Sequence, residues 1–176
     1  EQVVREEANR PPVNLAIVLD RSGSMRGEKI VQAKEAAIQA IRRMGAKDRI
    51  SIVAYSSHAE TIASAQSAKN AEQLVDLVRQ LQAGGGTALY AGMNQGAAEV
   101  RKNLDGEYFN RIILLSDGLA NEGPSSPADL IRLGRAHVKE DISVSTVGLG
   151  AGYNEDLMMK LAAASGGNHE FIEKAS

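Results

Sequence analysis

NLAIVLDRSGSM, residues 14–25, carries five consecutive apolar residues that run directly into an aspartate and two serines. The apolar run has the length and the Val, Ile and Leu content of a strand that is covered on both faces, as in a parallel sheet. Asp20 then lies at the carboxyl end of this strand, with Ser22 and Ser24 in the loop behind it. The stretch therefore predicts a buried strand that ends in a set of oxygen-bearing side chains.

The rest of the chain alternates between short apolar segments of this kind and segments in which apolar residues recur at helical spacing. Further strands are predicted at RISIVAY (49–55), RIILLSD (111–117), ISVSTVGLG (142–150) and the weaker HEFIE (169–173). Helices are predicted over 28–44, 70–82, 88–104, 127–139 and 154–164. Repeated strand-helix alternation predicts an α/β fold, with a parallel sheet that carries helices on both faces.

Length and composition exclude several classes of protein. The 176 residues suit one domain with a real core. The 20 basic and 22 acidic residues give a net charge of −2, without a Lys/Arg-rich run, which argues against a nucleic-acid binder. No cysteine is present, so disulfides, thiolate nucleophiles and Cys-based zinc sites are excluded. No apolar run approaches the roughly 18 residues that a membrane span needs.

The first residues, EQVVREEANRPP (1–12), are polar and close on two prolines, which is typical of a lead-in segment or linker. We therefore expect the domain to occupy residues 13–176. The chain begins with Glu1 rather than methionine, which indicates a piece of a longer protein. The cellular compartment cannot be inferred from such a piece.

Three loops carry oxygen-bearing residues where a parallel sheet places its ligand site, outside the carboxyl ends of the strands. They contribute Asp20, Ser22 and Ser24; Thr87, which follows three glycines; and Asp117, which ends a strand. Each residue alone is an ordinary turn former or helix cap. Together they form an all-oxygen set of the kind that Mg²⁺ prefers, with Mn²⁺ and Ca²⁺ as alternatives. The coincidence of all of them in matching positions favours a metal site.

These motifs resemble the metal-ion-dependent adhesion site of von Willebrand factor type A (vWA) domains. The resemblance rests on DRSGSM followed by Gly27, Lys29 and Ile30, on GGTAL (85–89) and on SDGLAN (116–121). The lead-in RPPVNL (10–15) and the helix after the first motif are most similar to bacterial members and to inter-alpha-trypsin-inhibitor heavy chains.

The resemblance implies a six-stranded, mostly parallel, doubly wound sheet in the order 3-2-1-4-5-6, with a short antiparallel edge strand near Glu60–Ala63. It also implies that Ser22 and Ser24 bind the metal directly. Asp20, Thr87 and Asp117 would bind it directly or through water. The C-terminal helix of some family members is absent or lies beyond residue 176.

The function that follows is metal-dependent protein binding, in adhesion or complex assembly. A metal ion surrounded mostly by hydroxyls stays electrophilic and gains by accepting a Glu or Asp carboxylate from a protein partner. We expect the rim of the site to set specificity, through Arg21, Met25, Arg26, Tyr90, Leu119 and Asn121. The resemblance also favours a monomeric domain of a larger protein, without direct membrane insertion, in an extracytoplasmic or envelope-associated location.

Two other functions are weighed against this one. The domain could be a scaffold subunit whose metal is mainly structural. A Mg²⁺-dependent phosphatase with Asp20 as nucleophile is less favoured, because that chemistry requires a second aspartate where this chain has Ser22. The absence of a G-x-S-x-G motif and the scattered positions of His58, His137 and His169 indicate neither a hydrolase triad nor a zinc site. We therefore do not expect an enzyme.

Overall fold

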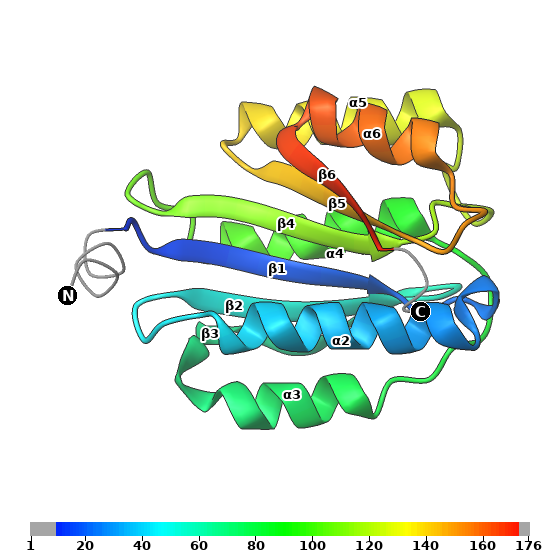
Figure 1. Ribbon diagram of the computed structural model, residues 1–176. Coiled ribbons are helices and arrows are strands. Elements are labelled where there is room, and N and C mark those ends of the chain that lie inside the picture. The colour runs from blue at the N-terminus through cyan, green and yellow to red at the C-terminus, as the bar shows by residue number, and fades with distance from the viewer. Residues whose placement is uncertain (1–9, 173–176) are drawn as a thin grey trace.

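A six-stranded sheet in the order β3-β2-β1-β4-β5-β6 forms the centre of the computed structural model, which describes residues 10–172 (Figure 1). All neighbouring strands are parallel except β2 and β3. The predicted fold class and strand order are confirmed. The strands are β1 (Val13–Asp20), β2 (Arg49–Tyr55), β3 (Ala59–Ser67), β4 (Phe109–Ser116), β5 (Ser143–Leu149) and β6 (Gly166–Ile172).

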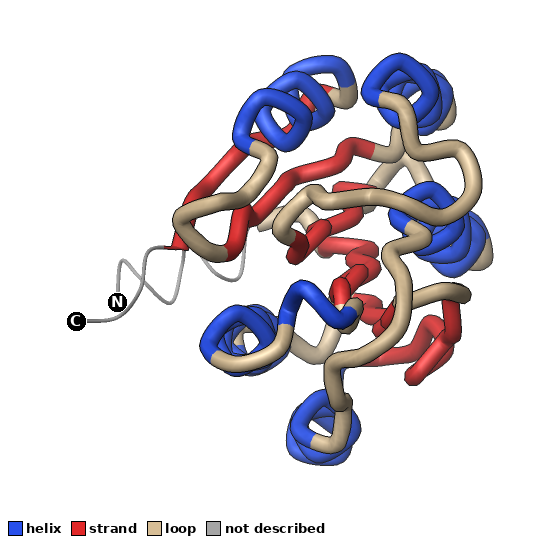
Figure 2. The backbone as a smooth tube through the Cα atoms, turned by 90° about the vertical axis from the view of Figure 1, so that its right-hand side faces the viewer, coloured by secondary structure: helices blue, strands red, loops and turns tan. Residues whose placement is uncertain are grey.

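Helices cover both faces of this sheet, with α2 and α3 on one face and α4, α5 and α6 on the other (Figures 1 and 2). Two short 3-10 turns, η1 (Gly23–Met25) and η2 (Ala68–Asn70), precede α2 and α3. The helices are α2 (Glu28–Arg42), α3 (Ala71–Arg79), α4 (Leu89–Arg101), α5 (Pro127–Lys139) and α6 (Glu155–Ala164). No helix within residues 10–172 is long and apolar enough to cross a membrane.

The continuous apolar character of β1 follows from its central place between these layers. Leu15, Ile17 and Leu19 pack into the cluster under α2 and α3, whereas Ala16 and Val18 pack toward α4. Since successive side chains of a strand point to opposite faces, a strand covered on both sides needs apolar residues at every position. β1 is therefore fixed from both faces, and its carboxyl end is held in a defined position.

Some predicted boundaries differ from those of the structure. The antiparallel edge strand, expected near Glu60–Ala63, is longer and runs over Ala59–Ser67. The helix predicted over 28–44 ends at Arg42, and the last strand begins at Gly166 rather than at residue 169. Residues 1–9 of the predicted lead-in segment, and residue 173 of the predicted last strand, lie outside the described residues.

His137 is a buried histidine near the end of α5. Its surface is 1% exposed, and in the described part of the chain neither ring nitrogen has a hydrogen-bond partner. Burial lowers the pKa of His137 from 6.5 to about 4; the nearby Arg101 adds to this effect, and Glu140 opposes it. The imidazole is therefore neutral in the folded protein near neutral pH.

We expect His137 to make the protein acid-sensitive. Because its pKa is lower in the folded protein, the unfolded chain binds the proton first as the pH falls below 6.5. The free energy of unfolding should decrease through this window, by about 3 kcal/mol once the pH reaches about 4. Urea unfolding at neutral and acidic pH measures this loss. His137→Leu should flatten the dependence, whereas the same change at the exposed His58 should leave it unaltered.

Candidate metal centre

Asp20 ends β1 as a fully buried carboxylate with both oxygens hydrogen-bonded. The backbone N–H of Ser22 donates to Oδ1 at 2.9 Å, and the Ser116 hydroxyl donates to Oδ2 at 2.7 Å. Ser116 Oγ in turn lies 3.1 Å from the hydroxyl of Tyr55 and accepts from the N–H of Gly118 at 2.9 Å. This chain of hydrogen bonds fixes the orientation of the Asp20 carboxylate.

The charge of Asp20 is costly in this position. Burial raises the pKa of Asp20 above its ordinary value of 3.8, and the charge of Asp117 adds to the effect. Hydrogen bonds from Ser22 and Ser116 act in the opposite direction. Burial also raises the pKa of Tyr55 well above 10.0, so its hydroxyl remains protonated. The fold therefore keeps a buried acid beside a second one, which is an arrangement that favours a cation.

Ser22 and Ser24 place two hydroxyls side by side behind Asp20. Ser22 begins the turn η1 with an extended backbone, and its Oγ lies 3.1 Å from that of Ser24. Ser22 is buried, whereas Ser24 is exposed. The sequence predicts an extended loop with period-two alternation, whereas the chain forms the turn η1 after Ser22. This turn brings the two hydroxyls together and leaves that of Ser24 open to solvent.

The glycine-rich second loop is joined to the first loop by backbone hydrogen bonds. Gly23 N–H donates to the carbonyl of Gly85 at 2.9 Å, and Gly84 N–H donates to that of Arg21 at 2.8 Å. A Cβ on Gly23 would lie 3.3 Å from the Gly85 oxygen, and Gly85 adopts φ +82. Glycine is needed here because the two backbones approach closely and one of them has a left-handed conformation. The buried Thr87 follows directly.

The third loop is in turn joined to the second through Asn121. Its Oδ1 accepts from Thr87 N–H at 2.8 Å, and its own N–H donates to the Thr87 carbonyl at 3.0 Å. The loops after β1 and β4 and the loop before α4 thus meet at the carboxyl edge of the sheet, which faces the viewer in Figure 2. All five residues predicted as ligands lie on these joined loops.

Asp117 is the second buried carboxylate at this edge. Its Oδ1 accepts from the N–H of Leu119 at 3.1 Å, and its Oδ2 lies 3.3 Å from the ammonium of Lys29. The carbonyl of Asp117 accepts from Asn154 N–H at 2.7 Å. In the part of the chain that the structure describes, Lys29 is the one basic side chain paired with either carboxylate.

The chemistry of this donor set fits a hard divalent cation. Two buried carboxylates and one ammonium leave a negative charge, and the neighbouring hydroxyls supply further oxygen ligands. Within residues 10–172, no group of three or more His, Cys, Asp or Glu side chains is placed to hold a metal ion. A metal at this edge would therefore depend on Ser and Thr hydroxyls, which excludes a zinc-type site.

The fold and the motifs agree with a family comparison. The model of the von Willebrand factor type A domain matches residues 14–176. The chain belongs to the von Willebrand factor type A domain family. This vWA domain is 32% identical over 167 residues to an uncharacterized protein, sll0103, of Synechocystis, covering 95% of the chain and 39% of that relative. It is 31% identical to inter-alpha-trypsin inhibitor heavy chain H4 of Sus scrofa, covering 89% of the chain and 18% of that protein.

Solved vWA structures show the same fold. A von Willebrand factor type A protein from Catenulispora acidiphila superimposes with a TM-score of 0.80 at 25% identity, over 93% of this chain and 39% of that one. The manganese-loaded TRAP protein of Plasmodium vivax gives a TM-score of 0.74 at 17% identity, over 93% and 69%. Since this chain spans less than half of both relatives in sequence, it corresponds to one part of such proteins.

The residues predicted for the rim of the vWA site fall into two groups. Arg26, Leu119 and Asn121 are exposed, and Arg21 is half-buried. Met25 is fully buried and packs into the core under α2, because η1 turns its side chain inward. Met25 therefore supports the first loop from below and presents no surface to a partner.

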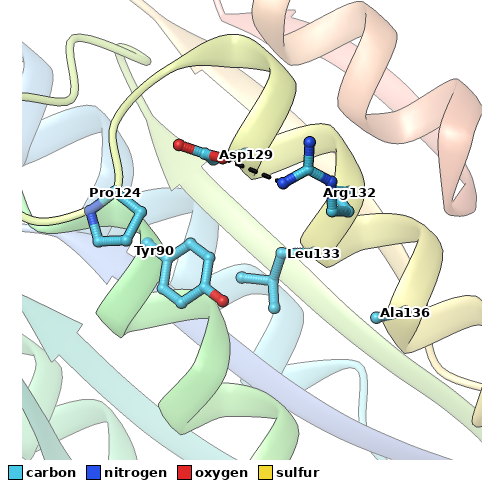
Figure 3. Close-up of a pocket in the computed structure, with 6 residues that line it drawn as sticks. All are labelled: Tyr90, Pro124, Asp129, Arg132, Leu133 and Ala136. Carbon is cyan, nitrogen blue, oxygen red and sulfur yellow. Dashed lines mark hydrogen bonds and ion pairs between the residues drawn. The ribbon is translucent and has the colours of Figure 1, made fainter.

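Tyr90, the last predicted rim residue, lies in a separate pocket of about 320 Å³ between α4 and α5 (Figure 3). Asp129 and Arg132 form an ion pair of 3.3 Å at this pocket. The remaining lining is mostly apolar and consists of Pro124, Leu133 and Ala136. Tyr90 lines this pocket from the first turn of α4, three positions after Thr87.

The structure also shows residues that sequence reasoning gave no role in the site. Lys29 reaches Asp117 from α2, and Ser116 and Tyr55 hold Asp20. The sequence carries only weak signals that these three residues belong to the site. Lys29 lies in the first motif, Ser116 directly precedes Asp117, and Tyr55 ends a buried strand. The pairing of β1 with β2 and β4 brings Tyr55 and Ser116 close to Asp20, and the packing of α2 on the sheet brings Lys29 to Asp117.

Proposed function

We propose that this vWA domain binds a divalent cation, Mg²⁺ in the first place, and through it a carboxylate of a protein partner. Asp20, Ser22, Ser24, Thr87 and Asp117 would hold the ion. The observation that carries the proposal is the pair of buried carboxylates beside hydroxyls on three joined loops. One of these hydroxyls, that of Ser24, is open to solvent. Domains of this family commonly mediate protein interactions and often bind a divalent metal.

The protein's own residues prepare this edge for binding. The hydrogen bonds to Asp20 and Asp117 hold the carboxylates in place, so that little ordering is needed when a ligand arrives. The exposed Ser24 marks the side from which a partner has access. When bound, the cation would supply an open coordination position for an acidic oxygen. Arg21 and Arg26, which lie on or next to the same loop, would steer an acidic partner toward it.

A mainly structural metal in a larger assembly is the second candidate, and it predicts the same metal affinity without metal-dependent partner binding. We do not propose an enzyme. A phosphatase with Asp20 as nucleophile requires a second aspartate two residues on as general acid, and this chain has Ser22 there. The extracytoplasmic or envelope location remains an expectation from the family resemblance.

Calorimetric titration of Mg²⁺, Mn²⁺ and Ca²⁺ into the EDTA-treated domain tests the metal site. We expect Ser24→Ala to weaken Mg²⁺ binding by at least about tenfold, because it removes an oxygen ligand. The melting temperature without metal should stay unchanged, since Ser24 is exposed. Ser64→Ala, an equally exposed change on β3, is the control. Equal Mg²⁺ affinity in both variants would contradict the ligand assignment, and a partner retained equally in Mg²⁺ and in EDTA would favour the structural alternative.

A further inference from the structure

Lys29 places a positive charge beside the proposed metal site, where it would repel a cation. It lies in the first turn of α2, where the helix macrodipole disfavours a cation. Its side chain is only 26% exposed, and its ammonium lies 3.3 Å from Oδ2 of the buried Asp117. The contact with Asp117 therefore outweighs an unfavourable local position, which indicates that the charge of Lys29 matters at this site.

The loop after β5 leaves space for the stem of this lysine. Gly150 has φ +84, and a Cβ at that position would lie 2.5 Å from Cε of Lys29. The same Cβ would also lie 3.2 Å from Cδ and 3.3 Å from Cγ. The Lys29 side chain thus runs along a glycine over much of its length. Packing, as well as charge, directs the ammonium to Asp117.

The charges at the edge can be counted from these contacts. Asp20 and Asp117 contribute two negative charges and Lys29 one positive charge. A divalent cation brings this total from −1 to +1, and one carboxylate from a partner brings it to zero. Without Lys29, the same cation would neutralise the site by itself. With Lys29 present, the metal-loaded site therefore carries a charge of +1, which one further anionic group neutralises.

We propose that Lys29 couples cation binding to carboxylate binding at this site. The inference rests on the proposed function and names its regulation. The ammonium repels the cation and so lowers the affinity of the site for metal alone. A carboxylate that binds the loaded site relieves this excess positive charge and raises the affinity for the metal. Coupling of this kind is reciprocal, so the metal raises the affinity for the carboxylate by the same factor.

The test compares Lys29→Met with the wild-type domain, using Mg²⁺ alone and Mg²⁺ with sodium acetate as a simple carboxylate. Removal of the ammonium should tighten Mg²⁺ binding by roughly 10- to 100-fold, given the strength of charge interactions over a few ångströms. Acetate, compared with chloride at equal ionic strength, should raise the Mg²⁺ affinity of the wild type several-fold. It should change that of Lys29→Met by less than about twofold.

Two further variants make the comparison specific. Lys34→Met removes a lysine of the same helix whose ammonium contacts the Arg79 carbonyl, and it should behave like the wild type. Lys29→Arg keeps the charge and should keep the acetate effect. Lys29→Met leaves Asp117 unpaired and lowers the stability of the metal-free domain, so thermal unfolding is followed as well. Mg²⁺ should raise its melting temperature more than that of the wild type.

The outcomes separate this inference from the proposed function. If the wild type binds Mg²⁺ and Lys29→Met binds it with the same affinity and the same acetate effect, Lys29 has no coupling role and the metal site stands. An equal shift in Lys34→Met would reduce the result to a general effect of net charge, which also overturns the inference. If the wild type fails to bind Mg²⁺ even with acetate, both the inference and the proposed function are wrong.

Discussion

Asparagine in place of Asp20 is expected to stabilise the metal-free domain by about 1 kcal/mol and to abolish its stabilisation by Mg²⁺. The wild-type carboxylate is buried beside Asp117, and burial raises its pKa, so its charged form is disfavoured in the folded protein. Asparagine is neutral and has nearly the same shape. Binding-site residues often have this effect, because they are selected for the bound ligand rather than for the stability of the empty protein.

The hydrogen bonds around Asp20 tolerate this change. The amide oxygen of asparagine can accept from Ser22 N–H, as Oδ1 does in the wild type. Its amide nitrogen would donate to Ser116 Oγ, and the hydrogen bond that Tyr55 donates to Ser116 in the wild type would reverse, so that the Ser116 hydroxyl donates to Tyr55. Thermal unfolding in EDTA and in Mg²⁺ measures both effects. Asp76→Asn, at an exposed carboxylate on α3, is the control. A less stable metal-free variant that still responds to Mg²⁺ would contradict the prediction.

Alanine in place of Gly167 is expected to destabilise the domain by about 3 kcal/mol or more. A Cβ on Gly167 would overlap the carbonyl group of Val144 on the neighbouring strand β5. Backbone atoms of a paired strand cannot move aside as a flexible side chain can, so the pairing of β5 with β6 has to open locally. The irregular register between Val144 and Thr146 lies beside this contact.

Urea unfolding of Gly167→Ala measures this loss of stability. Gly152→Ala is the matched control, because a Cβ on Gly152 meets no atom within 4 Å. The site loops follow β1 and β4 and precede α4, so the folded fraction of the variant should keep the Mg²⁺ affinity of the wild type. If the urea midpoint of Gly167→Ala equals that of Gly152→Ala, β6 can shift to accept the Cβ without loss of stability, and the prediction is wrong.

The elements with local signals could be predicted closely from the sequence. α5 begins at Pro127, as predicted, and the Ser126 hydroxyl caps it by accepting from Asp129 N–H at 3.2 Å. β1, β2 and β4 were recognisable because burial on both faces requires apolar residues throughout. β3 and β6 carry no such run, and their lengths depend on pairing with β2 and β5. That pairing depends on contacts far apart in the chain.

The candidate ligands were also recognisable from local sequence signals, whereas the residues that surround them were not. Each predicted ligand sits in a short motif at the end of a strand or the start of a helix. The supporting contacts join residues that are far apart, with 96 positions between Ser116 and Asp20 and 88 between Lys29 and Asp117. The inward turn of Met25 likewise depends on the geometry of η1 and on the core below it.

The central position of β1 has a mechanical consequence. The strand enters the domain at Val13, at the end of the sheet opposite its carboxyl edge, and its last residue is Asp20 (Figure 1). A pull between Val13 and a partner bound at that edge would run along the axis of β1. Its parallel ladders with β2 and β4 would then be loaded in shear, so their hydrogen bonds would share the force rather than open one after another. The two ladders beside β1 therefore oppose a pull between Val13 and the carboxyl edge of the sheet.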